Sequence, residues 1–236
     1  MRPIEDAWRS AENLRARGFE PFLAPVTILR ATGAQPPGED FDALLATSAN
    51  AFARLSAEAC ARLSGLKLYV AGERTAAAAS AAGFGAADGI APDAVALAVL
   101  IVARLPRASR FLYLAARDRK SDLETALAAA GHCIVATEVY IAEARPAWTA
   151  SEALGVSACG AALHYSRRSA ELAGILAERA GLGEHFRSLP HVCISQDATE
   201  PLRAFGARRI VVARGARETL LIDALGSAVG FGPSNR

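Results

Sequence analysis

The sequence predicts an α/β protein with two doubly wound parallel-sheet lobes of similar build, joined by a two-stranded β-ladder linker, with a cleft between them. Short, continuous apolar runs alternate with alanine-rich helical stretches, which is typical of parallel sheets covered on both faces. The two halves of the chain repeat one order of elements. Two long extended stretches, roughly 25–35 and 135–146, are expected to cross between the lobes as a pair.

The composition is that of a globular protein. The chain has 236 residues, of which 52% are hydrophobic and 21% charged, so it is long enough for a buried core and is not disordered. The net charge is +2 and aromatic residues make up only 6%. Because Lys and Arg are scattered rather than clustered, no nucleic-acid partner is predicted.

The N-terminal part predicts a helix, a strand and a connector. Apolar residues at helical spacing (Ile4, Trp8, Ala11 and Leu14) predict a helix over 4–18, which ends at Gly-Phe-Glu-Pro. "FLAPVTIL" then predicts a strand, and the Gly/Pro-rich "ATGAQPPGEDFD" a connector. The further predicted strands are 43–47, 67–72, 110–115, 134–142, 160–166, 191–195 and 209–214.

A repeated order of predicted elements in the two halves of the chain indicates two domains. "LLATSANAFARL" is followed by "LYVAGERTAAAASAAGF", and "ALHYSRRSAELAGIL" by "VCISQDATEPLRAFGA". Each half has a strand ending in a hydroxyl, a helix, a second strand, and a Thr at the start of another helix. The predicted boundaries are 1–33 plus 144–236 for lobe 1 and 36–140 for lobe 2.

Cysteine and histidine patterns predict no metal site. The cysteines form no C-x-x-C pair and are interpreted as reduced, and the histidines show no H-E-x-x-H spacing. "MRPIEDAWRS" is not a secretory signal, and no window reaches about 18 consecutive apolar residues, so no membrane span is predicted. We expect a cytoplasmic monomer.

Hydroxyl and glycine residues follow the predicted strands. In doubly wound sheets, ligands bind beyond the carboxyl ends of the strands. Two such rims, rich in N–H and O–H donors and poor in carboxylates, would suit a polyanionic ligand. The candidates in lobe 2 are Thr47, Ser48, Asn50, Gly72 and Thr75, and those in lobe 1 are Tyr165, Ser166, Ser169, Ser195 and Thr199.

Each candidate also has a structural interpretation. Ser48, Asn50, Thr75, Ser169 and Thr199 all fit helix N-caps. A tyrosine at a strand end is more often half-buried packing than chemistry, and Arg117 and Lys120 also fit solvated charges at a helix start. The sequence contains no Ser-His-Asp set, paired carboxylates or phosphate-binding loop of the G-x-x-x-x-G-K-[ST] type.

Several motifs together resemble a known family. "ATSANAF", "YVAGERTAAAASAAGF", "LYLAARD", "ATEVYIA", "LHYSRRSAEL", "ISQDATEPLRAFG" and "VVARGARETLLIDAL", in this order, resemble uroporphyrinogen-III synthase over nearly the full length. The resemblance implies a cofactor-free lyase of tetrapyrrole biosynthesis, with the linear hydroxymethylbilane bound between two lobes. It also implies cyclisation through loss of water and a spiro intermediate, so that ring D is inverted.

The resemblance also implies roles for particular residues. A tyrosine at the position of Tyr165 is the usual candidate for helping the hydroxyl leave, as a donor or through bound water. Few other side chains are decisive, because the enzyme mainly holds one curled conformer of a bilane that cyclises unaided to the uninverted isomer. Transient contact with the preceding pathway enzyme is a further expectation. The binding positions carried over are Ser48, Thr75, Arg117, Ser166, Thr199 and Thr219.

The N-terminus departs from the family pattern. Family members usually begin with a strand ending in Thr-Arg-Pro, whereas this chain starts at "MRP", with Arg2 as the candidate cleft arginine. Loss of that strand would leave an unpaired sheet edge and a gap in the core. The alternatives are a start further upstream, a substitute segment, or a weakened relative that binds an anionic tetrapyrrole or metabolite without catalysis. A periplasmic-type solute receptor is a third possibility that the missing export signal disfavours.

Overall fold

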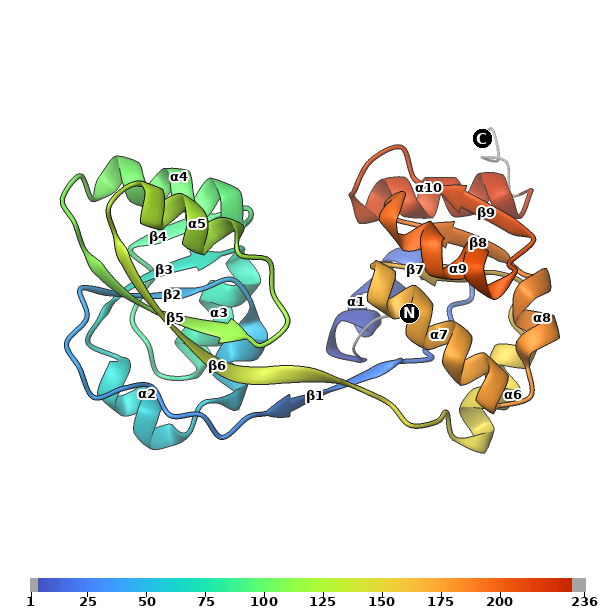
Figure 1. Cartoon of the computed structure of the whole chain (residues 1–236), viewed down its shortest axis with the longest axis horizontal. Coiled ribbons are helices and arrows are strands. Elements are labelled where there is room, and N and C mark those ends of the chain that lie inside the picture. The colour runs from blue at the N-terminus through green and yellow to red at the C-terminus, as the bar shows by residue number, and fades with distance from the viewer. Residues whose placement is uncertain (1–3, 231–236) are drawn as a thin grey trace. The chain divides into compact units, whose positions relative to one another are not determined.

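The computed structural model describes residues 4–230, and the chain divides into two compact units. Unit 1 combines residues 1–28 with 143–236, and unit 2 is the intervening segment, Leu29–Ala142. In Figure 1 the blue helix α1 (Ile4–Arg15) accordingly belongs to the same unit as the orange and red C-terminal elements. The chain therefore passes from one unit to the other twice.

Unit 2 is built on a sheet with strand order β1-β6-β5-β2-β3-β4. The pairs β6–β5, β5–β2, β2–β3 and β3–β4 are parallel. Chain order runs outward from β2 in both directions, so the topological switch point lies between β2 and β5. The strands are β1 (Thr27–Ala31), β2 (Ala43–Ala46), β3 (Lys67–Ala71), β4 (Gly89–Ala91), β5 (Arg110–Ala116) and β6 (Cys133–Ala144).

Helices cover both faces of this sheet (Figure 1). Side chains alternate along the strands, so Leu44 and Leu112 pack toward η1, α2 and α3, whereas Leu45 and Phe111 pack toward α4 and α5. Burial on both faces explains why these strands have continuous apolar sequences. The helices are η1 (Ala49–Arg54), α2 (Ala57–Leu63), α3 (Glu73–Ala81), α4 (Ala94–Arg104) and α5 (Asp122–Ala129).

Strands β1 and β6 are neighbours and contain both crossings between the units. The Thr32 N–H donates to the Val139 carbonyl at 3.1 Å, and the Arg145 N–H donates to the Val26 carbonyl at 3.0 Å. The earlier residue of the first segment, Val26, pairs with the later residue of the second, Arg145. The two segments therefore run antiparallel. The predicted pairing of the two long extended stretches is confirmed.

Unit 1 contains a parallel sheet of order β7-β8-β9. Its strands are β7 (Ala162–His164), β8 (Pro190–Cys193) and β9 (Arg209–Val212). One face packs on α1 and α10 through Leu14 and Leu221, and the other on α7 and α9 through Leu176 and Leu202. The remaining helices are α6 (Ala150–Ser157), α7 (Arg167–Arg179), α8 (Gly183–Ser188), η2 (Asp197–Thr199), α9 (Glu200–Phe205) and α10 (Glu218–Ala228).

Strand β7 is an edge strand with a cavity beside it. Among residues 4–230 it pairs only with β8. The adjacent cavity has a volume of about 580 Å³. Its walls are mainly apolar and include Ala11, Leu14, Ala162, Leu163, Tyr165 and Leu225. Residues of α1 and α10 line this cavity, so part of the apolar surface of both helices faces it.

Most predicted elements are present. The predicted helix at 4–18 ends at Arg15, and each strand predicted from residue 43 onward occurs within about three residues of its expected ends. The first predicted strand was placed too early, because β1 begins at Thr27 where its pairing with β6 begins. Strand β4 was missed, since "GIA" is too short to carry a periodic signal.

We predict that Gly89→Ala destabilises unit 2. A Cβ at Gly89 would lie 2.7 Å from Cδ1 of Tyr69 and 2.9 Å from Cδ2 of Leu100, and the Tyr69 side chain is buried. Overpacking of this kind costs about 1–3 kcal/mol of unfolding free energy, measured by urea denaturation. Gly85→Ala is the matched control, because a Cβ there meets no atom within 4 Å. Equal stability of the two variants would contradict the prediction.

Candidate functional site

Three predicted site residues of unit 2 lie at the edge of its sheet that is formed by the carboxyl ends of the strands. Thr47 follows β2, Gly72 follows β3 and Arg117 follows β5. These strands are neighbours and parallel, so their carboxyl ends lie together. Thr47 and Arg117 flank the switch point between β2 and β5, which is where open α/β sheets bind ligands.

A hydrogen bond joins the two strands at the switch point. The Thr47 Oγ1 and Tyr113 Oη atoms are 2.7 Å apart. Burial raises the pKa of the Tyr113 phenol, so this hydroxyl stays protonated at neutral pH. Tyr113 was not predicted as a site residue, since it lies inside an apolar strand. The signal available in the sequence was the phenolic oxygen that Tyr113 places in the otherwise apolar run of β5.

Ser48 is a helix cap, and Asn50 is not. The Ser48 Oγ atom accepts a bond from the Asn50 N–H at 3.2 Å, at the start of η1. Asn50 lies within η1, and its Oδ1 accepts from Arg54 Nη1 at 3.3 Å. The N-cap interpretation therefore holds for Ser48 and is wrong for Asn50, because η1 starts at Ala49, two residues earlier than an N-cap at Asn50 would require.

Gly72 is the N-cap of α3, in place of the expected Thr75. Gly72 has φ of +84°, which glycine adopts without a steric penalty. Its N–H donates to the Ala91 carbonyl at 2.7 Å, and it provides no side-chain cap for α3. Thr75 is the third helical residue and its side chain is buried. At the start of α3 the Thr75 and Ala76 N–H groups donate to the Gly72 carbonyl, at 3.0 and 3.2 Å, and no side chain caps the helix.

The cations after β5 share one carboxylate. Arg117 Nε lies 3.1 Å from Glu138 Oε2, and Arg119 Nη1 lies 3.2 Å from Glu138 Oε1. Arg119 Nη2 also lies 2.8 Å from Glu124 Oε1, and the Arg119 side chain is mostly buried. The Arg117 side chain is 54% exposed, so solvent and ligands reach it, whereas Lys120 is exposed with no salt bridge among the described residues.

The predicted residues of unit 1 likewise follow neighbouring parallel strands. Tyr165 and Ser166 follow β7, Ser195 follows β8, and Thr219 lies at the start of α10 after β9. All are therefore at the carboxyl-end edge of the second sheet. Thr219 is exposed, and the N-cap of α10, Arg217, makes no side-chain capping bond.

The hydroxyl groups at this edge differ in whether their hydrogen already donates to a backbone carbonyl. Ser166 Oγ accepts from the Ser169 N–H at 3.1 Å, which leaves its own hydrogen unused in the described contacts. Ser169 Oγ donates to the Ser166 carbonyl at 2.9 Å, and Thr199 Oγ1 donates to the Gln196 carbonyl at 2.8 Å. Ser166, like Ser48, therefore keeps a donor for a ligand, and the structure shows no such donor on Ser169 or Thr199.

Tyr165 contacts a carboxylate that was not predicted. Its hydroxyl donates to Glu218 Oε1 at 3.0 Å. Glu218 and Glu138 lie at the two edges, so the expectation of edges poor in carboxylates is wrong. Each carboxylate is bound by several donors, which lowers the repulsion it would exert on an anionic ligand. Sequence spacing could not place Glu218 beside Tyr165, since 53 positions separate them.

Other predictions concern absent features or residues outside the described range. Arg2 lies outside residues 4–230. Within that range no helix has the length and apolar character needed to cross a bilayer. No group of three or more His, Cys, Asp or Glu side chains in the described part of the chain is arranged to hold a metal ion.

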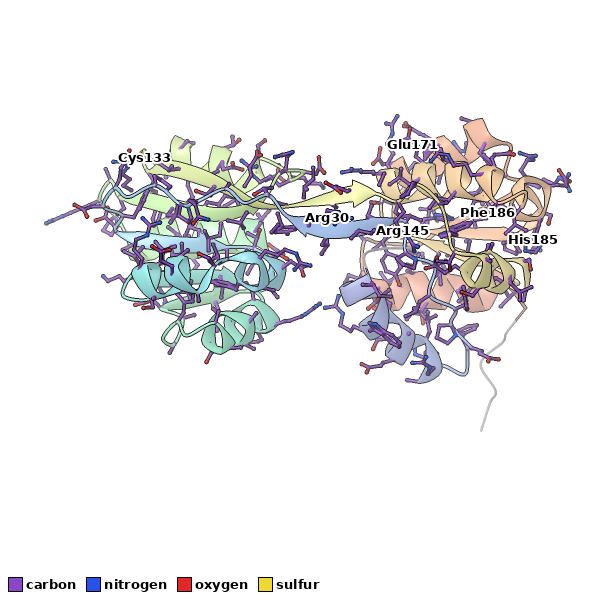
Figure 2. The ribbon with its side chains drawn as sticks, turned by 90° about the horizontal axis from the view of Figure 1, so that it is seen from below. Arg30, Cys133, Arg145, Glu171, His185 and Phe186 are labelled. Carbon is purple, nitrogen blue, oxygen red and sulfur yellow. The ribbon has the colours of Figure 1, made fainter. Side chains whose placement is uncertain are left out.

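Two buried histidines lie beneath the unit 1 edge. His191 Nε2 is 2.7 Å from the Phe186 carbonyl, so it must carry a hydrogen and donate. His191 Nδ1 is 2.9 Å from His164 Nε2 and accepts from it, which leaves both rings neutral with hydrogen on Nε2. Burial lowers the pKa of both histidines, that of His164 well below its ordinary value of 6.5. Phe186, which receives the bond, is labelled in Figure 2.

We predict that unit 1 loses stability as pH falls below about 6.5. The folded state keeps His164 and His191 neutral, whereas the unfolded chain binds protons there once pH falls below the ordinary pKa. Stability contributed by the neutral pair is complete above that pH and declines below it, by up to about 1.4 kcal/mol per pH unit for each proton taken up.

Urea denaturation between pH 5.5 and 7.5 measures this loss, and ¹⁵N chemical shifts of the imidazole rings report the tautomers. Hydrogen on Nδ1 of either ring at neutral pH, or a stability that does not change over this range, would contradict the assignment of His164 and His191.

A family model that covers most of the chain shows its family, and solved structures are similar to it in fold. A family model described as uroporphyrinogen-III synthase HemD matches residues 9–223. The crystal structure of uroporphyrinogen-III synthetase from Helicobacter pylori is 18% identical, with a TM-score of 0.57, over 88% of this chain and 95% of that chain. Uroporphyrinogen III synthase from Thermus thermophilus is 20% identical, with a TM-score of 0.42, over 96% of this chain and 94% of that chain. A search of curated proteins gives no match.

Proposed function

Because the chain belongs to the uroporphyrinogen-III synthase family, we propose that it cyclises hydroxymethylbilane to uroporphyrinogen III, with inversion of ring D and loss of water. The single observation that carries this proposal is the family-model match over residues 9–223. The parallel sheet with its switch point, and the donors gathered at the carboxyl ends of the strands, support it. The proposal includes no cofactor.

The proposed substrate is a flexible chain of pyrroles that carries many carboxylates. In unit 2, Ser48 offers a hydroxyl hydrogen, Arg117 offers an exposed guanidinium, and α3 begins after β3 without a capping side chain. In unit 1, Ser166 offers a hydroxyl hydrogen, and α10 begins after β9 without a capping side chain. Helix N-termini also bring the positive end of the helix dipole. Fixed donors of this kind restrict a flexible polyanion to few conformers.

Tyr165 is the proposed catalytic residue. Loss of water from the hydroxymethyl group breaks a C–O bond, whose electron pair stays on oxygen, and a proton must reach that oxygen. A phenol is protonated at neutral pH and can deliver this proton directly or through a bound water. Tyr165 follows β7 at the donor-rich edge, where its hydroxyl donates to Glu218, so its O–H bond must turn from Glu218 to the substrate to deliver the proton.

We predict that the purified protein, given freshly made hydroxymethylbilane, shifts the product from uroporphyrinogen I to uroporphyrinogen III without added metal or nucleotide. The uncatalysed reaction gives the type I isomer, so the isomer ratio after oxidation and chromatography reports the enzyme directly. Heat-denatured protein is the control. Product that stays type I, even where the bilane binds tightly, would refute the proposed function.

We predict that Tyr165→Phe lowers kcat by about 100-fold and leaves the product type III. The loss of a general acid typically costs a factor of this order, whereas the conformer selected by the binding groups is retained. Tyr69→Phe is the matched control, because it removes a phenol from the middle of β3 in the unit 2 core. Wild-type kcat in Tyr165→Phe would remove Tyr165 from the catalytic role.

A further inference from the structure

The side chains at the end of β5 form a network around Glu138. Its Oε2 atom accepts from Arg117 Nε at 3.1 Å, and its Oε1 atom accepts from Arg119 Nη1 at 3.2 Å. Arg119 also donates to Glu124 Oε1 at 2.8 Å and, through Nη1, to the Ala116 carbonyl at 2.9 Å. The Arg119 side chain is mostly buried, whereas that of Arg117 is exposed. The network therefore has an anchored end at Arg119 and an accessible end at Arg117.

A β-bulge lies beside this network. Ala115 pairs with Glu138 and Ala116 with Tyr140, so β6 carries one extra residue at this point. Directly paired residues have side chains on the same face of the sheet, and Arg117, two residues after Ala115, returns to that face. Pairing continues beyond the bulge, because the Arg117 N–H donates to the Tyr140 carbonyl at 2.9 Å. The backbone of both strands thus brings the Glu138 and Arg117 side chains together.

The Arg117 guanidinium keeps its outer hydrogen-bonding edge unused. A guanidinium presents a planar fork of N–H donors, in which Nη1 and Nη2 together can bind both oxygens of one carboxylate. Glu138 accepts from Nε only, and within residues 4–230 the Nη1 and Nη2 groups of Arg117 form no hydrogen bond. Because 54% of the Arg117 side chain is exposed, a carboxylate of a ligand can reach this edge.

An arginine without such a partner would be a weaker binding group. A free Arg side chain samples many rotamers, and ordering it costs free energy when a ligand binds. An isolated surface ion pair contributes little order, but Glu138 is bound to the mostly buried Arg119, which is in turn bound to Glu124. The Arg117 side chain is therefore ordered before a ligand arrives.

We propose that Glu138 is a positioning residue, anchored by Arg119, that holds Arg117 with its Nη1–Nη2 edge free for a carboxylate of the substrate. This inference rests on the proposed function, in which the ligand is a polycarboxylate tetrapyrrole. Arg117 follows β5 beside the switch point, where open α/β sheets bind ligands. The Arg119 guanidinium also lies 5.9 Å from the centroid of the Tyr113 ring, and the Tyr113 hydroxyl bonds to Thr47. Contacts therefore continue across the switch point from Arg117 to Thr47.

The two effects that Glu138 can have on an anionic ligand differ in sign. As a charge alone it repels the ligand, so its removal would strengthen binding. As a positioning residue it orders Arg117, so its removal weakens binding even though a negative charge is lost. Glu138→Gln separates the two effects, because the amide has nearly the same shape, a single acceptor oxygen and no charge. That oxygen cannot replace the two carboxylate oxygens, one of which accepts from Arg117 and the other from Arg119.

The test is a double-mutant cycle of wild type, Arg117→Ala, Glu138→Gln and the double variant. KM and kcat are measured with hydroxymethylbilane, Kd for the polycarboxylate uroporphyrin I by fluorescence quenching, and the melting temperature shows that each variant is folded. We expect Arg117→Ala to raise KM and Kd about 10-fold and Glu138→Gln to raise them about 3- to 10-fold, with kcat within about 2-fold of wild type. The double variant should match Arg117→Ala within about 2-fold.

Glu39→Gln is the matched control. Glu39 forms an exposed salt bridge with Arg110, the first residue of β5, so the variant makes the same change of charge at the opposite end of the same strand. It should keep the wild-type KM and Kd.

Three results would overturn the inference: tighter or unchanged binding in Glu138→Gln, an equal loss from Glu138→Gln with and without Arg117, or an equal loss in Glu39→Gln. If wild type makes only type I product, the proposed function fails, and the Kd values for uroporphyrin I decide the positioning role by the same criteria. Wild type that makes only type I product and does not bind uroporphyrin I would overturn both proposals.

Discussion

Parallel strand pairing is the constraint on which the candidate site depends. It brings the carboxyl ends of β2, β3 and β5 to one edge and those of β7, β8 and β9 to another. Residues separated by as many as 70 positions in unit 2, Thr47 and Arg117 among them, thereby come to one edge. Backbone hydrogen bonds of the sheet, rather than contacts among the site residues, create this arrangement, so the site residues are available for other partners.

Capping and ligand binding are compatible at these edges. A serine that caps a helix accepts a bond through an oxygen lone pair, and its hydrogen is still able to donate. Ser48 and Ser166 are in this state, whereas the hydroxyl hydrogens of Ser169 and Thr199 already serve backbone carbonyls. The interpretation of a hydroxyl as cap or ligand therefore depends on the direction of one hydrogen. A sequence does not contain that information.

The elements were predictable because each one satisfies local rules. Alternate burial of Leu44 and Leu45 requires apolar residues at both positions, and the resulting run is visible in the sequence. Three-dimensional contacts were less predictable. Tyr113 could not be predicted because it lies within an apolar strand. Glu218 resembles any acid at the start of a helix, and only the three-dimensional structure shows its contacts with α1 and Tyr165. Thr75 was misplaced by a few residues, because Gly72 with its positive φ begins that helix instead.

Two carboxylates, those of Glu138 and Glu218, lie among the donors proposed to bind a polyanion. Glu138 is paired with Arg117 and Arg119, and Glu218 accepts hydrogen bonds from three neutral groups. The first arrangement compensates negative charge with positive charge. The second distributes the charge of the carboxylate over these donors, and the start of α10 stabilises it further. In both arrangements the carboxylate is bound within the protein, so it repels the proposed polyanionic ligand less than an unbound carboxylate would.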